Sequence, residues 1–295
     1  MVVTLSIISD LINGLSLGSI YALIALGYTM VYGIAKMLNF AHGDLIMVGA
    51  YAAIVFITQM DLPVWMGITF SIITCMIFGV VIERVAYKPL RTAPPLSVLI
   101  TAIGVSYFLQ SLALIVFGSN QKSFPNVIDN KIYEIGEINL KTNTIVTLVV
   151  TTLIMTVLTL FINKTKMGKA MRAVSEDKEA AELMGISVNK VITITFAIGS
   201  SLAAVAGVIF SATYGFIGPY SGSMPGIKAF VAAVFGGIGS IPGAMLGGLL
   251  LGIIETFSKV YISTELSDAI VFAVLILVLT IKPTGLLGKN TREKV

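Results

Sequence analysis

The chain has 295 residues, of which 56% are hydrophobic and 12% are charged, and its formal net charge is +4. An average soluble domain carries roughly 25% charged residues, so this composition excludes a soluble enzyme, a nucleic-acid-binding domain and a disordered tail. The apolar runs are continuous rather than alternating, which disfavours a membrane β-barrel. We therefore predict an all-α, polytopic integral membrane protein surrounded by membrane lipid, because helices satisfy their own backbone groups in hydrocarbon.

Six apolar stretches approach the ~20 residues that a membrane span needs. In chain order they are Ile7–Val31, Val64–Ile82, Ser97–Phe117, Thr144–Ile162, Val191–Thr213 and Leu266–Ile281. Two further regions are irregular: Gly43–Met60 is short and begins in a polar cluster, and Ile227–Val260 is interrupted by glycines and Pro242. The chain, residues 1–295, is expected to form one domain of about eight membrane helices, some broken or re-entrant, or nine if both halves of the interrupted region cross.

Small residues recur at four-residue spacing, for example Gly14 with Gly18 and Gly248 with Gly252. This spacing lets two helix backbones approach closely in lipid. The pattern predicts tight packing within one bundle, with a subunit interface as the alternative.

Thirteen of the 19 lysine and arginine residues lie in three segments: Arg84–Arg91, Lys164–Lys190 and the tail from Lys282 onward. Cytoplasmic loops of membrane proteins carry an excess of these residues. We therefore expect these segments and the C-terminus to be cytoplasmic. The loop Gly118–Asn143 carries balanced charge and is expected to face outward.

The residues do not predict catalysis, a bound cofactor or a metal centre. One histidine, His42, and one cysteine, Cys75, cannot build a metal cluster. The stretch Met167–Ala170 contains a Gly-Lys pair but lacks the first glycine and the hydroxyl of a phosphate-binding loop. We therefore expect the chain to be non-enzymatic and to bind no ATP itself.

The most strongly charged part of the chain, segment 163–190, holds ten charged residues in 28. Ser175 is expected to begin a short helix with acidic residues in its first turn, and Gly185 to end it in a left-handed turn. The apolar face of this helix is expected to consist of Ala180, Leu183 and Met184.

The same segment contains the pattern Glu-Ala-Ala-x-x-x-Gly, with Glu179, Ala180, Ala181 and Gly185 at its fixed positions. This pattern resembles the motif by which permeases of ABC importers dock onto their ATPase subunits. The resemblance implies that segment 163–190 couples the chain to an ATPase, with Ala180 and Ala181 against the wall of the partner. The alternative is a solvated helix that only connects two spans.

The two irregular regions are the best candidates for a translocation path, because paired broken segments mark the binding site of many transporters. The candidate residues are Asn39, His42, Asp44, Gly236, Gly237 and Gly239. For His42 and Asp44 the alternative is a hydrogen-bonded turn near the cytoplasmic surface. Glu255 lies inside a predicted span, where it either lines the path or pairs with Lys259 one turn away.

Segments along nearly the full chain, in the same order, are similar to the LivH-type permeases, which are membrane subunits of branched-chain amino-acid ABC importers. The matching segments are Gly18–Ile34, Leu38–Asp44, Gly49–Tyr51, Pro89–Arg91, Ala229–Phe230, Val234–Ala244 and Leu279–Gly288. This likeness is more specific than any single motif. It implies a permease that translocates leucine, isoleucine and valine across the bacterial or archaeal cytoplasmic (inner) membrane.

The resemblance also implies partners. These are a second, homologous permease (LivM-like), two cytoplasmic ABC ATPase subunits (LivG- and LivF-like) that bind the ATP, and an extracytoplasmic substrate-binding protein. A permease for urea or short amides is an alternative within transport. An ATPase-independent channel or scaffold is the alternative of another class, and it would have no use for a docking helix at Glu179.

Overall fold

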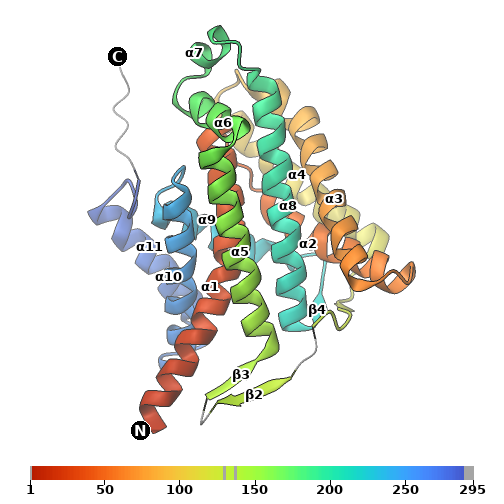
Figure 1. Ribbon diagram of the computed structural model, residues 1–295, viewed down its shortest axis with the longest axis vertical. Helices are drawn as coiled ribbons and strands as arrows, with labels where there is room; N and C mark the ends of the chain where they lie inside the picture. The colour runs from red at the N-terminus through yellow and green to blue at the C-terminus, as the bar shows by residue number, and fades with distance from the viewer. Residues whose placement is uncertain (1, 129–130, 136–137, 289–295) are drawn as a thin grey trace.

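The computed structural model describes residues 2–128, 131–135 and 138–288. Its first half contains α1 Val2–Ala35, α2 His42–Ile54, the π-helical turn η1 Val55–Gln59, α3 Val64–Ile82, the π-helical turn η2 Glu83–Tyr87, the 3-10 turn η3 Lys88–Leu90, α4 Pro95–Phe117, β1 Lys122–Ser123, β2 Ile132–Ile135 and β3 Ile138–Lys141. Its second half contains α5 Thr142–Lys164, α6 Lys166–Glu176, α7 Lys178–Leu183, α8 Val188–Tyr214, β4 Phe216–Ile217, α9 Ser223–Gly236, α10 Ile241–Tyr261 and α11 Ser267–Ile281. The fold is an all-α, polytopic bundle, as the composition predicts (Figure 1).

Within the described residues, seven helices are long and apolar enough to cross a membrane. They are α1, α2 with η1, α3 with η2 and η3, α4, α5, α8 and α10. Two further apolar helices, α9 and α11, have only 14 and 15 residues. At 1.5 Å per residue α9 rises about 21 Å, which is less than the ~30 Å of a hydrocarbon core. The interrupted region is therefore a half-length helix followed by a full span, and the prediction of broken helices is confirmed.

The basic segments 84–91 and 164–190 lie at one end of the bundle, the upper end in Figure 1, where α6 and α7 are found, and the described residues of the third segment, 282–288, follow α11. Arg91 bonds Asn189 in the first turn of α8, and the amide of Leu286 donates to Phe235 at the end of α9. The N-terminal end of α1 and the antiparallel β2–β3 hairpin, in which Ile132 pairs with Lys141, lie at the opposite end. The loop 118–143, part of which lies outside the described residues, therefore starts and ends far from the basic segments.

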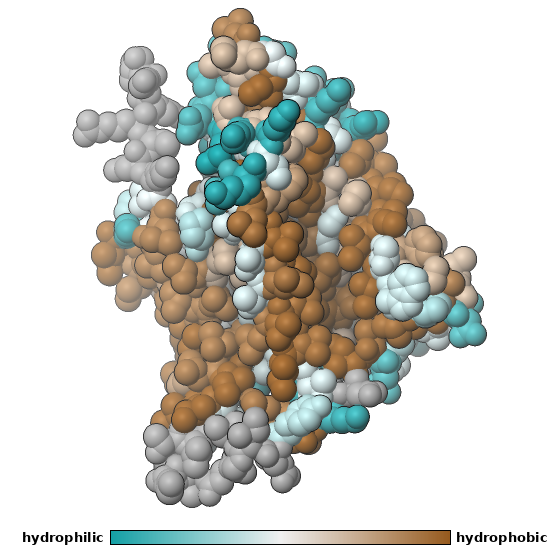
Figure 2. All heavy atoms as spheres, in the orientation of Figure 1, coloured by the Kyte–Doolittle hydropathy of each residue, from teal (hydrophilic) through white to brown (hydrophobic). Residues whose placement is uncertain are grey.

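The tightest seam of the bundle joins α1 to α10 through small residues. A Cβ built on Gly18 would lie 2.7 Å from the carbonyl oxygen of Leu249, and one on Gly252 would lie 2.1 Å from the amide nitrogen of Gly18. Only residues without side chains allow such an approach, so the predicted packing role of the small residues is confirmed. Around this core the outward-facing side chains form the broad apolar belt of Figure 2.

Candidate functional site

Two helices begin in the interior of the bundle, away from either end. α2 begins at His42, whose ring lies against Gly27 and Tyr28 of α1. Gly27 lies about 12 Å inside the end of α1 at Ala35, at 1.5 Å per residue. α9 begins at Ser223 directly beside the first turn of α2. Neither helix start has a side-chain cap, so each directs the positive end of its dipole into the same region.

The two helix starts touch through glycines. A Cβ on Gly222 would lie 2.3 Å from the carbonyl oxygen of Gly43, and one on Gly226 would lie 2.6 Å from the Cα of Gly43. Because neither backbone carries a side chain here, the two helix starts can pack against each other at backbone distance. The four-residue spacing of Gly218, Gly222 and Gly226 is the feature of the sequence that indicates this close approach.

A buried polar cluster joins α2, α4 and α9 at this point. The amide nitrogen of Gln110 donates to the Asp44 carboxylate at 2.9 Å, and it lies 3.2 Å from the Ser223 hydroxyl and 3.3 Å from the Ser106 hydroxyl. Both Asp44 and Gln110 are buried. Sequence reasoning singled out Asp44 but missed Gln110, although a lone amide inside an otherwise apolar span is itself a functional signal.

A cavity of about 410 Å³ opens beside this cluster. Its polar lining is Asp44, Ser106, Gln110 and Ser223. Its aromatic and aliphatic lining is Tyr28, Phe40, Ile103, Tyr107, Tyr220 and Ile227. The volume lies within the roughly 300–1,000 Å³ of small-molecule sites. A carboxylate, two uncapped helix starts and an apolar wall in one cavity suit a small zwitterion with an apolar side chain.

The other two residues of the first predicted path segment are anchored away from the cavity lining. The Asn39 side-chain oxygen accepts a hydrogen bond from the Tyr87 hydroxyl at 2.9 Å, and its backbone oxygen accepts from the amide of His42. His42 is buried with its ring 4.7 Å from that of Tyr28, edge to face. Asn39 and His42 thus shape the turn into α2, and Asp44 alone of the three lines the cavity.

The second predicted path segment lies elsewhere. Gly236, Gly237 and Gly239 form the tight turn between α9 and α10, and none of them lines the cavity. Gly237 has φ +106°, and a Cβ there would lie 2.4 Å from the amide nitrogen of Gly288. The two irregular regions meet through α9, since Phe40 packs against Phe230, but the glycine turn 237–240 is closed by the chain's own segment 285–288 and does not reach the cavity. The region that meets the start of α2 is the start of α9.

Glu255 lies outside the cavity, in a buried ion cluster on another side of α9. Its carboxylate contacts Lys259 at 2.6 Å and Lys228 at 2.8 Å, and it accepts a hydrogen bond from the Tyr21 hydroxyl at 2.8 Å. Lys228 also contacts Asp268 at 2.6 Å. Of the two alternatives given for Glu255, the structure shows the pairing with Lys259. Lys228, which the sequence analysis did not consider, joins α9 to both α10 and α11.

The predicted coupling segment forms two short helices in place of one. Ser175 lies inside α6, so the expectation that it begins the helix is wrong. Asp177 caps α7 instead and accepts a hydrogen bond from the Ala180 amide at 2.9 Å. Asp is as good a cap as Ser, and the periodicity of α6 runs on through Ser175. Gly185 has φ +82°, as predicted for the turn that ends the helix.

The side chains of α7 divide sharply between the bundle and solvent. Ala181 is 4% exposed and packs into the chain's own core, so it is not available to a partner's wall as expected. Leu183 and Met184 are 89% and 83% exposed, and Glu179 and Ala180 are also exposed. Two large apolar side chains at the tip of the bundle, in a strongly charged segment, indicate a contact surface for another protein.

α7 is tied to the end of α1 by Lys178. Its Nζ donates to the carbonyl oxygen of Ala35 at 2.9 Å. Burial, together with the positive charges of Arg91 and Lys36, lowers the pKa of Lys178 below its ordinary value. Because α1 leads through residues 36–41 into α2, this bond places the tip of the bundle one loop away from the cavity.

The chain is similar to known proteins over nearly its full length. A family model described as "Branched-chain amino acid transport system / permease component" matches residues 11–279. The chain is 46% identical to the high-affinity branched-chain amino acid transport system permease protein LivH of Escherichia coli (strain K12), over 98% of this chain and 97% of that protein. It is 47% identical to the corresponding protein BraD of Pseudomonas aeruginosa, over 98% of each chain. It is 28% identical to a probable LivH permease of Methanocaldococcus jannaschii, over 93% of this chain and 90% of that protein.

Proposed function

Because the chain belongs to the family of permease components of branched-chain amino acid transport systems, we propose that it is the membrane subunit through which an ABC importer moves leucine, isoleucine and valine. The chain is a multi-pass membrane protein of the permease type, and the hydrolysis of ATP belongs to partner subunits. The cavity where α2 and α9 begin is the observation that supports a path for the amino acid through this subunit.

The cavity offers one group for each part of an amino acid. The Asp44 carboxylate would hold the α-ammonium group, and the Ser223 hydroxyl, together with the positive ends of the α2 and α9 dipoles, would favour the α-carboxylate. Phe40, Ile103 and Ile227 would contact a branched aliphatic side chain. A binding protein selects the cargo first, so the cavity needs only modest affinity to pass it on.

The cavity also indicates where the second, homologous permease would lie. Tyr107, Tyr220 and Ile227 line the cavity and are exposed in the isolated chain. A partner permease covering this face would close the cavity into a path between two subunits. An extracytoplasmic binding protein would deliver cargo from the end of the bundle that carries the β2–β3 hairpin.

The tip formed by α7 would receive the ATPase. Leu183 and Met184 would enter a cleft of the ATPase, while Lys178 transmits its movement to the end of α1. This arrangement requires the basic end of the bundle to be cytoplasmic, together with the end of α11 and the C-terminus. The positive-inside bias supports that orientation.

The test is transport by the reconstituted importer with Asp44→Asn. Loss of a hydrogen bond to a charged group costs about 1.5–3 kcal/mol, so leucine uptake into vesicles should fall roughly 10- to 100-fold. Asp10→Asn is the matched control, because Asp10 accepts a hydrogen bond from the Tyr261 hydroxyl near the start of α1 and lies outside the cavity. Co-purification of all subunits should be unchanged in both variants. Uptake by Asp44→Asn at the control level would refute this cavity as the path without affecting the family assignment.

A further inference from the structure

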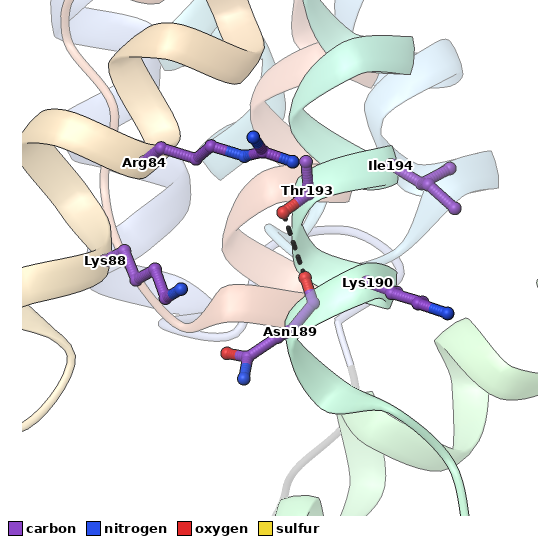
Figure 3. A pocket seen from close by; sticks show the side chains of 6 residues that line it. All are labelled: Arg84, Lys88, Asn189, Lys190, Thr193 and Ile194. Carbon is purple, nitrogen blue, oxygen red and sulfur yellow. Dashed lines mark hydrogen bonds between the residues drawn. The ribbon is translucent and has the colours of Figure 1, made fainter.

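A second cavity, of about 450 Å³, lies at the basic end of the bundle between α3–η3 and the first turns of α8. It is lined by Arg84, Lys88, Asn189, Lys190, Thr193 and Ile194. Figure 3 shows Arg84 and Lys88 extending from one wall toward Asn189 and Thr193 on the other, while the Lys190 side chain points away. The proposed transport function gives this cavity no role.

No acidic side chain in the described part of the chain neutralises the positive charge of this cavity. The neighbouring carboxylate, Glu83, is buried and already engaged by Arg91 and by the Thr193 hydroxyl. Within the described residues, neither Arg84 nor Lys88 forms a salt bridge, and no acidic residue lines the cavity. α8 also begins here, at Val188, without a side-chain cap, so the positive end of its dipole adds to the same field.

The two cations follow an exposed apolar stretch of the chain. Ile77 and Val81 on α3 are exposed and apolar, and Val85, next to Arg84, is exposed as well. Arg84 and Lys88 are also exposed, so the exposed apolar surface of α3 leads directly to the two cations. An apolar stretch that ends in two unpaired cations matches a phospholipid, with its acyl chain along α3 and its headgroup at the cavity.

We propose that this cavity binds the phosphate of an anionic phospholipid headgroup. Arg84 provides a planar fork of donors that fits phosphate oxygens, and Lys88 adds a second positive charge. Basic pockets between membrane helices on the side of the positive loops are suited to such headgroups. The bound lipid would join η2–η3 to α8, the helix that follows α7 in the chain.

The test measures lipid binding to the purified importer by native mass spectrometry, with phosphatidylglycerol titrated against phosphatidylcholine. The double variant Arg84→Gln with Lys88→Gln should weaken phosphatidylglycerol binding by ~30-fold, since each basic residue near an anionic headgroup contributes roughly fivefold. Lys166→Gln with Lys169→Gln is the matched control, because it removes two exposed cations from α6 at the same end. That control should leave the binding unchanged.

Other arms of the experiment separate the possible sources of phosphate. Inorganic phosphate at tens of millimolar should not displace the lipid, because it lacks the acyl chain that α3 contacts. Binding of inorganic phosphate that depends on Arg84 and Lys88, with no such dependence for phosphatidylglycerol, would overturn the lipid assignment. So would equal effects of the two double variants on lipid binding. Loss of ATPase co-purification with unchanged lipid binding would instead assign this cavity to a protein contact and refute the proposal.

Discussion

Lys228 should matter more to stability than Lys259, although both contact Glu255. The change Lys228→Met keeps an unbranched side chain of similar length and removes the charge that joins α9 to Glu255 and Asp268. Breaking a buried ion pair costs about 3–5 kcal/mol, because the remaining charge is left without a partner. Lys259 still contacts Glu255, and Asp268 is 40% exposed, so the expected cost lies at the lower end, about 3 kcal/mol.

The control is Lys259→Met, which removes a lysine that is 35% exposed. Solvent screens such a charge, and we expect a cost of about 1 kcal/mol or less. Thermal unfolding of the solubilised importer should therefore show a loss of roughly 5–10 °C for Lys228→Met and of a few degrees at most for the control. Adding Glu255→Gln to Lys228→Met should recover part of the loss, since it removes a buried carboxylate charge that the half-exposed Lys259 alone then balances.

Equal melting temperatures for Lys228→Met and Lys259→Met would refute this reasoning, because burial would then not decide the cost. A double variant that melts lower than Lys228→Met alone would contradict the role given to the Glu255 charge. Leucine uptake provides an independent check. α9 also carries Ser223 and Gly226 at the cavity, so a loosened α9 should reduce uptake even below the melting temperature.

Three further predictions concern the tip of the bundle. The valine of Gly185→Val would meet no neighbouring atom, but a side chain disfavours the left-handed φ of this position by about 1 kcal/mol or more. The variant should therefore reduce ATPase co-purification and substrate-stimulated ATP hydrolysis, whereas Gly104→Val, which also has no neighbouring atoms, should reduce neither. Equal effects of the two variants would exclude a role for the turn at Gly185. Ala181→Leu should lower the melting temperature, because overpacking a buried site costs about 1–3 kcal/mol, while Ala180→Leu should leave it unchanged, because Ala180 is exposed. A lower melting temperature for Ala180→Leu than for Ala181→Leu would contradict the observed burial. The lowered pKa of Lys178 means that the unfolded chain binds the proton more tightly, so stability should rise with pH between that lowered pKa and ~10.4; Lys178→Met should lack this rise in pH-dependent melting curves.

Elements set by local chemistry could be predicted from the sequence. The bounds of α3, Val64–Ile82, follow from an apolar run that begins after Pro63. Gly185 adopts the left-handed turn because glycine is the residue that does so without strain. The start of α7 was predicted two residues early, because Ser175 and Asp177 are both good caps and only the packing of α6 decides between them.

The candidate site could be predicted only in part, because it is assembled from distant segments. Asp44 stood out as an ionisable residue next to a short apolar run, but its partners Gln110 and Ser223 come from α4 and α9. The turn at Gly237 has the stronger glycine signal in the sequence, yet those glycines serve a close approach to segment 285–288. A glycine pattern indicates that something comes near the backbone and does not indicate what.

The glycine seam between α1 and α10 has a consequence for biosynthesis. Gly18 leaves the ribosome roughly 230 residues before Gly248 and Leu249, and at roughly 5–20 residues per second this is a delay of roughly 10–50 s. During that time the glycine face of α1 has no α10 to cover it and must be held by lipid or by the insertion machinery. Chains stalled before residue 241 should therefore leave the glycine face of α1 accessible to crosslinkers carried by the surrounding lipid, and completion of α10 should close that access.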